Sequence, residues 1–403
     1  MIVKIAIVHT DFRLYWVARL VALRKYLAGK GVVLHVVEIA GKGSPYSFAG
    51  DSNHEGEGWH CIYGDREMES VSAAEAVDGV LEMLDRIDPD VVIGGAIAFP
   101  SGAAAVRWAN RNRRHVVIFD DARLEDVPRN ALTNWVKRQI YSLVDAVIIP
   151  APSHDETYRY FGFSPDRINH GINAIDNAFF EQEDEACSGH LTKMLPDGPF
   201  FLVVGRQIAV KNLENLLLAY IEASGQKAFE PWSLVFVGGG PEHEKLKGIA
   251  EGSCGVRVLF LDFLSQEHLK SCYHRASALI LPSHKETWGL VVNEAMASGL
   301  PVLISERCGC ADALVSDGLN GYRFDPENVD QIARALGKFV SLSDEERLSM
   351  RKASKGIISE WGLSRFCDGV WGAVMFCGKN RKRSGSLWGK YLIRRWNGRY
   401  RPV

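Results

Sequence analysis

Two glutamates eight positions apart mark the segment where chemistry is most readily placed. Glu286 and Glu294 lie in KETWGLVVNEAMASGLPVLIS, residues 285–305. The pattern predicts a helix that starts near Trp288 or Gly289 and ends at Gly299. Glu286 would then stand at the mouth of the helix and Glu294 about two turns in. At about 1.5 Å per helical residue, the carboxylates would be roughly 8 to 12 Å apart along the axis.

The first turn of this predicted helix suits an anion. Its backbone N–H groups, from Trp288, Gly289 and Leu290 onward, favour a phosphate, and Gly289 has no side chain to block the approach. A carboxylate on either side could accept hydrogen bonds from hydroxyl groups. The arrangement matches a sugar joined to a nucleoside diphosphate. The alternative is two surface glutamates on a helix of no special function.

A pair of cations follows a second predicted strand. Arg206 and Lys211 occur in VVGRQIAVKN, directly after the run Phe200 to Val204. In parallel sheets, ligands bind beyond the carboxyl ends of the strands, so both cations fall at the ligand-bearing edge. They could clamp a diphosphate and stabilise it as it leaves. A solvated pair of loop charges is the alternative.

Two further segments follow strands at the same kind of edge. VGGGPEHEKLK would allow close approach of a nucleotide at Gly239, although glycine turns after strands are common and the pattern favours a purely structural turn. Asp120 and Asp121 follow the predicted strand Val116 to Phe119 and are candidates for contact with an acceptor or a donor.

Two other motifs imitate metal sites. Asp88 and Asp90 spell D-x-D but precede a strand, which puts them at the wrong end of the sheet. Cys308 and Cys310 flank a glycine with no second Cys or His pair at a zinc spacing, which favours a tight loop of small residues. We therefore expect neither a metal nor any other cofactor.

Composition limits the class of protein. A chain of 403 residues is too long for a single hydrophobic core, which favours two or three domains. Its hydrophobic content of 47% and charged content of 24% are typical of a globular protein. Eight cysteines are too sparse for a disulfide scaffold, which predicts a reducing, cytoplasmic compartment. The N-terminus reads as a first strand and not a signal peptide, and no apolar run is long enough to span a membrane.

Short β-branched runs alternate with helical segments along the whole chain, which predicts parallel sheets in an α/β fold. The expected strands are Val3 to Val8, Val33 to Ile39, Val91 to Ile93, Val116 to Phe119, Ala146 to Ile149, Phe200 to Val204, Ser233 to Val237, Val256 to Leu261, Ala278 to Leu281 and Val302 to Ile304. Residues 181–198 are polar and rich in Gly and Pro, so we expect a linker there, and residues 41–60 suggest a long loop.

Several ordered motifs together resemble the family 4 glycosyltransferases, which have the GT-B fold of two Rossmann-like, doubly wound domains facing a cleft. ETWGLVVNEAMASGLPV resembles the family's E-x7-E motif, and GRQIAVKN is similar to its G-R-x-x-x-x-K-[GN] loop. HGINAIDNAFF, VFVGGGPEHEKL, LSQEHLKSCYHRASALILPS and DGLNGYRFDP follow the family's order. The resemblance covers about residues 140–335 well and the rest weakly.

The resemblance implies a nucleotide-sugar donor, transfer with retention of anomeric configuration, and a dispensable metal. It implies that Glu286 contacts the donor sugar, Glu294 the ribose, and Arg206 with Lys211 the diphosphate. Two departures limit it: IVHTDFRLYW replaces the glycine pair often found after the first strand, and FDDARLED occupies a loop where many members have a histidine. No role passes to His115.

The expected domains are an N-terminal acceptor-side domain (1–180), the linker (181–198), a donor domain (199–360), a helix that crosses back to the first domain (361–377) and a basic tail (378–403). The expected activity is transfer of a hexose or derivative from a UDP- or GDP-sugar to a polysaccharide or lipid-linked acceptor. A GT-B epimerase and a non-catalytic GT-B scaffold subunit are the alternatives.

The tail contains nine Lys or Arg residues and no acid after position 378, in a chain whose formal net charge is −2. On a helix Trp388, Leu392 and Trp396 would share one face, which suits an anionic membrane surface. We expect peripheral attachment to the cytoplasmic face of a membrane. A disordered, solvated tail is the alternative, and nucleic acid is not an expected partner.

Overall fold

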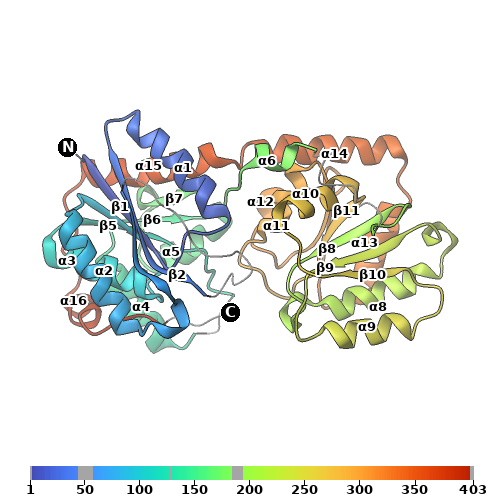
Figure 1. Cartoon of the computed structure of the whole chain (residues 1–403), viewed down its shortest axis with the longest axis horizontal. Helices are drawn as coiled ribbons and strands as arrows, with labels where there is room; N and C mark the ends of the chain where they lie inside the picture. The colour runs from blue at the N-terminus through green and yellow to red at the C-terminus, as the bar shows by residue number, and fades with distance from the viewer. Residues whose placement is uncertain (1, 44–57, 127–128, 184–193, 400–403) are drawn as a thin grey trace. The chain divides into compact units, whose positions relative to one another are not determined.

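The computed structural model describes residues 2–43, 58–126, 129–183 and 194–399. The chain forms two compact units (Figure 1): unit 1 comprises Met1–Ala174 and Leu363–Val403, and unit 2 comprises Ile175–Gly362. The predicted linker, residues 181–198, therefore falls within unit 2, and residues 184–193 of it lie outside the described residues.

Unit 1 is built on a parallel seven-stranded sheet in the order β3-β2-β1-β4-β5-β6-β7. Its strands are β1 (Lys4–His9), β2 (Val33–Lys42), β3 (Trp59–Glu67), β4 (Val91–Gly94), β5 (His115–Phe119), β6 (Ala146–Ile149) and β7 (Ile168–His170). Its helices are α1 (Tyr15–Ala28), α2 (Ala73–Ile87), α3 (Pro100–Asn112), α4 (Ala131–Tyr141), α5 (Asp155–Tyr160), α15 (Leu363–Lys379) and α16 (Leu387–Ile393).

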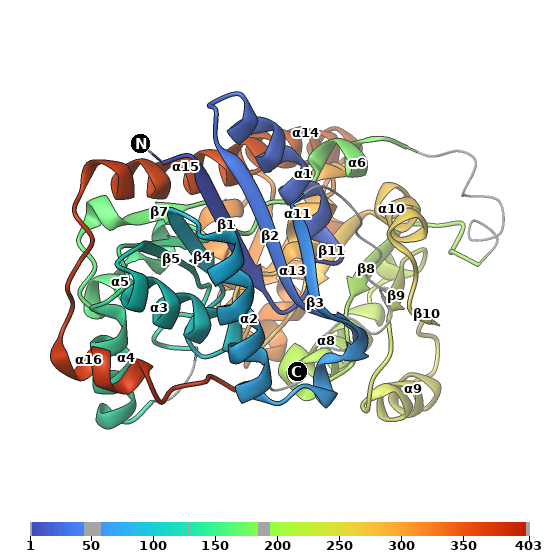
Figure 2. The same ribbon diagram turned by 60° about the vertical axis from the view of Figure 1, so that its left-hand side comes forward.

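Alternation along the central strands of unit 1 supplies both faces of its sheet with apolar side chains. Ala6 and Val8 of β1 point into a core shared with α2 and α3, whereas Ile5 and Ile7 join a second core with α1 and α15. Figure 2 shows these helices beside the strands. The predicted closing helix is thus α15, and it packs within unit 1.

Unit 2 has a parallel six-stranded sheet in the order β10-β9-β8-β11-β12-β13. Its strands are β8 (Phe200–Val204), β9 (Ser233–Val237), β10 (Val258–Leu261), β11 (Ala278–Leu281), β12 (Val302–Ser305) and β13 (Gly321–Phe324). Its helices are α6 (Asn177–Glu181), α8 (Leu213–Ser224), α9 (His243–Glu251), α10 (Gln266–Arg275), α11 (Leu290–Ala297), α12 (Ala311–Leu314), α13 (Val329–Val340) and α14 (Asp344–Ser359).

The two sheets confirm the predicted α/β class of two doubly wound units. The sequence missed three strands, β3, β7 and β13, because each is short or polar and lies at a sheet edge, where it pairs with one neighbouring strand. The predicted loop at residues 41–60 is wrong at its ends, since β2 runs to Lys42 and β3 begins at Trp59. Residues 44–57 lie outside the described residues.

The tail is also ordered differently from the prediction. Trp388 is 59% exposed on α16, but Leu392 and Trp396 pack against the core of unit 1. The indole of Trp396 donates to the carbonyl of Ile97 over 2.6 Å. The single face predicted for these three side chains is wrong because α16 ends at Ile393, and Trp396 lies beyond it. The last four residues, 400–403, lie outside the described residues.

Among the described residues, every helix falls short of the length and apolar character that a membrane span requires.

Candidate functional site

The loop after β8 carries both predicted cations and is anchored by hydrogen bonds from the side chain of one asparagine. Asn212 adopts a left-handed conformation (φ 55°), which asparagine tolerates better than most residues. Its side-chain amide donates to the carbonyl of Pro282 (3.0 Å) and to that of Pro326 (2.7 Å). The loop after β8 is thereby tied to the segments that follow β11 and β13.

This fastening brings together two residues that are 75 positions apart. The ammonium of Lys211 forms an ion pair with the carboxylate of Glu286. The side chains of Lys211 and Glu286 are 20% and 18% exposed, so the ion pair is partly accessible to solvent. Arg206 lies exposed in the same loop. The structure thus places a predicted diphosphate-binding cation next to the acid predicted to contact the sugar.

The backbone around Glu286 is held by the segment Cys308 to Cys310. The N–H of Gly309 donates to the carbonyl of Glu286 over 2.9 Å. A Cβ atom at position 309 would lie 1.9 Å from the carbonyl oxygen of Thr287, which no side chain could tolerate. The glycine of this C-G-C segment is therefore explained by close packing of two backbones.

Helix α11 begins at Leu290, and no side chain caps its N-terminus. Gly289 precedes it with φ of 102°, a conformation that favours glycine. The first turn contains no acidic residue. A helix N-terminus without a capping side chain or an acid attracts an anion, as predicted from the sequence.

Two other predicted residues are buried around α11. Trp288 is 1% exposed, donates from its indole to Asn293 Oδ1 over 2.9 Å, and packs on Trp361. Glu294 is also 1% exposed and accepts a hydrogen bond of 2.6 Å from the hydroxyl of Tyr273. The indole of Trp288 is thus occupied by contacts within unit 2, and contact of Trp288 with a ligand or of Glu294 with a ribose stays a prediction.

The three glycines after β9 have different environments. A Cβ at Gly238 would lie 2.4 Å from the carbonyl oxygen of Gly205, and one at Gly240 would lie 2.4 Å from that of Gln207. Both glycines therefore serve the close contact between the loops after β8 and β9. A Cβ at Gly239 would meet nothing within 4 Å, which leaves this position as the one with room for a ligand.

Sequence reasoning missed Gln207 between these loops. Its side chain is 1% exposed and donates to the carbonyl of Gly238 over 2.7 Å. Its amide oxygen lies 2.9 Å from Nδ1 of His243. No local signal marks this residue, because a glutamine in a loop after a strand is ordinarily solvated.

In unit 1 the two candidate acids differ. Asp120 is buried, accepts a hydrogen bond from Tyr141, and lies 3.4 Å from the ammonium of Lys137. Burial would raise the pKa of Asp120, but the charge of Lys137 and the hydroxyl of Tyr141 outweigh it and lower the pKa. Asp120 is thus held by Lys137 and Tyr141, whereas Asp121 is half-buried, and contact of either acid with an acceptor or a donor stays a prediction.

The loop after β1 contains polar residues that the sequence did not mark. Arg13 and Asp11 form a buried ion pair of 3.4 Å. Glu38, in the middle of β2, is fully buried and accepts a hydrogen bond from the N–H of Phe12 over 2.9 Å. Burial lowers the pKa of neighbouring His9. The loop after β1 therefore contains a buried charged cluster.

The acids of the D-x-D segment are structural. Asp90 accepts from the N–H groups of Val3 (2.8 Å) and Lys4 (3.0 Å), and both acids pair with Arg114. They fasten the amino ends of β1 and β4, as their place before a strand indicated.

One group in the described part of the chain is close enough to hold a metal ion: His115, Asp145 and Cys377. Asp145 is already paired with the ammonium of Lys382 at 2.8 Å, and burial raises the pKa of Cys377. A metal ion would have to displace the ammonium of Lys382. We therefore interpret the cluster as a structural contact that holds the tail to unit 1.

Comparison with known proteins gives this geometry a context. Residues 193–356 match the family model described as "Glycosyl transferases group 1". The chain is 23% identical over 319 residues to the sulfoquinovosyl transferase of Arabidopsis thaliana, covering 76% of this chain and 57% of that protein. It is 30% identical over 189 residues to a D-inositol 3-phosphate glycosyltransferase of Acidothermus cellulolyticus, covering 45% of this chain and 42% of the relative. The matches thus span about half the length of these relatives.

Solved structures share the fold. A sucrose-phosphate synthase from Thermosynechococcus elongatus superposes with a TM-score of 0.71 at 18% identity, covering 93% of this chain and all of that chain. The Anabaena protein HepE, solved in complex with UDP-glucose, gives a TM-score of 0.69 at 13% identity, covering 92% of this chain and 99% of that one.

Proposed function

We propose that this chain, whose residues 193–356 match the model of the group 1 glycosyltransferases, transfers a hexose or a hexose derivative from a UDP- or GDP-sugar. The acceptor is a polysaccharide or a lipid-linked glycan. The anomeric configuration of the donor is retained.

The observation that carries this proposal is the ion pair of Lys211 and Glu286 beside the uncapped N-terminus of α11. In the proposed complex Lys211 turns to the diphosphate together with Arg206, and Glu286 is released to accept hydrogen bonds from the sugar. Glu294 lies one turn into α11 and is assigned to the ribose. The backbone at Gly239, Gly289 and Leu290 allows the nucleotide close approach.

The chemistry follows from this placement. The bond between the sugar C1 and the phosphate oxygen breaks, a bond from the acceptor oxygen to C1 forms, and the proton of the acceptor hydroxyl leaves with the nucleoside diphosphate. Negative charge grows on the departing diphosphate. Lys211 changes partner when the donor binds, so that Arg206 and Lys211 are already in place to stabilise this charge when the bond to the sugar breaks.

We propose that no metal is required, because the two cations and the helix N-terminus supply the positive charge that a divalent ion would otherwise bring. Activity should survive EDTA. Complete loss with EDTA, restored by Mn²⁺, would contradict this part of the proposal.

A screen of UDP- and GDP-sugars by thermal shift, followed by transfer assays with the sugar that binds, tests the proposal. Binding and transfer to an added glycan acceptor are expected. Turnover of the donor with no acceptor present would favour an epimerase. Absence of binding by every nucleotide-sugar would favour a non-catalytic scaffold subunit.

A further inference from the structure

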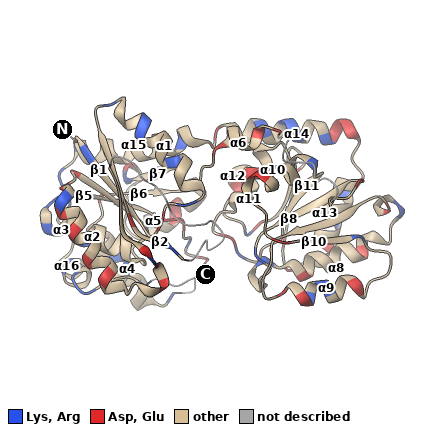
Figure 3. Ribbon diagram, in the orientation of Figure 1, with Lys and Arg blue, Asp and Glu red and all other residues tan. Residues whose placement is uncertain are grey.

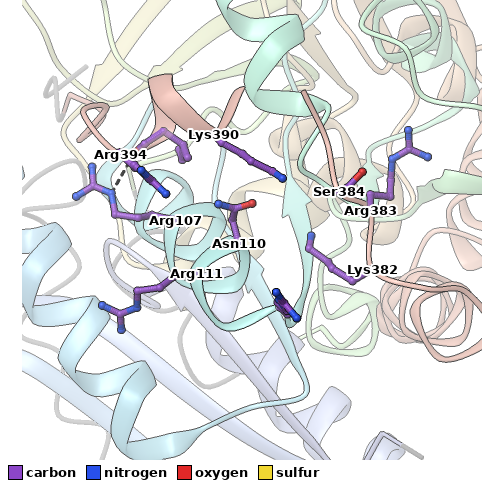
Figure 4. A pocket seen from close by; sticks show the side chains of 10 residues that line it. Arg107, Asn110, Arg111, Lys382, Arg383, Ser384, Lys390 and Arg394 are labelled. Atoms are coloured by element: carbon purple, nitrogen blue, oxygen red, sulfur yellow. Dashed lines mark hydrogen bonds between the residues drawn. The ribbon is translucent and has the colours of Figure 1, made fainter. Parts of the chain in front are cut away.

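A basic cavity of about 790 Å³ lies in unit 1, built by α3 and the tail (Figure 4). No acidic residue lines it, and its lining includes seven cations: Arg107, Arg111, Arg113, Lys382, Arg383, Lys390 and Arg394. Figure 3 shows Lys and Arg without acids along α3, whereas α9 of unit 2 carries both signs. The sequence marked the tail as basic but did not indicate a cavity.

The walls of this basic pocket are set by the fold. Arg107 donates from Nε to the carbonyl of Ile393 (3.0 Å) and from Nη2 to that of Trp396 (2.9 Å), which holds the end of α16 against α3. Lys382 donates to the carbonyl of Leu143 and pairs with Asp145. The pocket is therefore a fixed concavity and not a chance gathering of flexible side chains.

The positive charge in the pocket is only partly balanced. Arg111 pairs with Asp85 over 2.6 Å, and Lys382 with Asp145 over 2.8 Å. Within the described residues, the side chains of Arg113, Arg383, Lys390 and Arg394 form no hydrogen bond or ion pair. Like charges held together repel, so an anionic ligand would relieve the repulsion and gain charge-assisted hydrogen bonds.

An exposed apolar patch adjoins the pocket on the same helix. Side chains of α4 and α16 contribute to it: Leu132 (68% exposed), Trp135 (40%), Leu387 (83%), Trp388 (59%) and Tyr391 (50%). The rings of Trp135 and Trp388 meet edge to face at 5.9 Å. Helix α16 thus carries one cation of the pocket, Lys390, and is followed by a second, Arg394, while its exposed aromatic and aliphatic groups form the patch.

We propose that the basic pocket binds phosphate headgroups of an anionic membrane while the patch of Leu132, Trp135, Leu387, Trp388 and Tyr391 enters the interfacial layer. Tryptophan and tyrosine favour the membrane interface, and exposed leucines gain from contact with acyl chains. A nucleic acid would use the aromatics to stack bases, but the exposed leucines Leu132 and Leu387 beside them gain nothing from bases. This inference rests on the proposed function insofar as it brings the enzyme to a lipid-linked acceptor.

Co-sedimentation of the full chain with phosphatidylcholine vesicles containing about one third phosphatidylglycerol tests the proposal. The variant Lys390→Gln/Arg394→Gln should bind about 30-fold more weakly, from about fivefold for each cation lost near headgroups. The control Lys227→Gln/Lys352→Gln removes two exposed cations of unit 2 and should bind as the wild type does. Trp388→Ser should weaken binding with little change in its salt dependence. Truncation is avoided, because removal of the tail would expose the core around Ile393.

Equal binding to pure phosphatidylcholine vesicles would overturn the proposal, as would equal binding by the Lys390/Arg394 variant and the control. Thermal stabilisation by inorganic diphosphate without vesicle binding would show a soluble-anion site instead. Nucleotide-sugar binding by unit 2 is measured in parallel on the same variants. Variants of the pocket that lose vesicle binding but still bind the donor would support the membrane proposal. Absence of donor binding in the wild type would contradict the proposed function and leave the membrane proposal untouched.

Discussion

At the scale of single residues, the ion pair of Lys211 and Glu286 is the feature that a bound donor must change. Each side chain is less than a quarter exposed, and each lies within the segment matched by the family model. A carboxylate that already neutralises Lys211 keeps the empty site from repelling its own cations. In the proposed complex, a diphosphate of higher charge replaces the carboxylate of Glu286 as the partner of Lys211.

Lys211→Ala and Arg206→Ala should each lower transfer by roughly 10²-fold or more, the cost of losing one preorganised charge contact to a transition state. Steady-state assays with the donor found by the screen measure this. Lys227→Ala, an exposed lysine of the same unit, serves as the matched control and should keep full activity. Wild-type turnover in the Arg206→Ala/Lys211→Ala double variant would refute the assignment.

At the scale of elements, the tail is held to the sheet of unit 1 by Asp145. This carboxylate accepts from the N–H of Val116 (2.8 Å), pairs with Lys382, and accepts from the N–H of Arg383 (3.1 Å). Burial would raise the pKa of Asp145, but His115, Lys382 and the backbone amide of Val116 together lower it. The acid is therefore the point where the sheet and the tail are joined.

Asp145→Asn should reduce the free energy of unfolding at pH 7 by roughly 3–5 kcal/mol, because it leaves Lys382 buried without a carboxylate. A carboxylate with a lowered native pKa binds fewer protons folded than unfolded. Its contribution is thus complete above the ordinary aspartate value of about 3.9 and is lost as the pH falls below that value. Urea unfolding at several pH values should show the difference between wild type and variant shrinking in acid. Asp166→Asn, at an exposed site of the same unit, is the control: its free energy of unfolding should stay close to that of the wild type at every pH.

The contact of α16 with α4 depends on a glycine. A Cβ at Gly389 would lie 2.3 Å from the carbonyl oxygen of Gln139, so Gly389→Ala should push the helices apart and lower the melting temperature. Gly248→Ala on α9 is the matched control: a Cβ there meets nothing within 4 Å, and the change should stabilise by up to about 1 kcal/mol. A Gly389→Ala variant as stable as the wild type would show that the helices are not in backbone contact.

At the scale of the whole molecule, the two units are built differently. Unit 2 is one continuous segment, Ile175–Gly362, with its own apolar core, whereas unit 1 is completed by the chain returning as Leu363–Val403. All residues assigned to the donor lie in unit 2. We therefore expect unit 2 to fold as an isolated fragment, whereas unit 1 needs the C-terminal segment to complete its core.

A fragment of residues 175–362 should fold and bind the donor nucleotide but transfer nothing, because the expected acceptor side is absent. Isothermal titration with UDP and GDP measures the binding, and circular dichroism checks the fold. The same fragment with Lys211→Ala is the control and should bind more weakly. A folded fragment without affinity for either nucleotide would place the donor contacts elsewhere.

The sequence alone determined what depends on local pattern. The strands β6, β8, β9 and β11 were predicted at the bounds observed, because short β-branched runs between turn residues report burial directly. Residue type and spacing likewise indicated the glycine-rich turns and the start of α11. They also marked the candidate residues Arg206, Lys211, Glu286 and Glu294.

Only the tertiary structure decided what depends on contacts between distant segments. Lys211 meets Glu286 because β8 and β11 are neighbours in the sheet, and no local pattern encodes that adjacency. The buried partners of Asp120, and the docking of the tail that turns a run of basic residues into a pocket, were beyond prediction for the same reason. Periodicity shows that a segment has an apolar side, but packing against the rest of the chain decides which side is covered and what remains exposed.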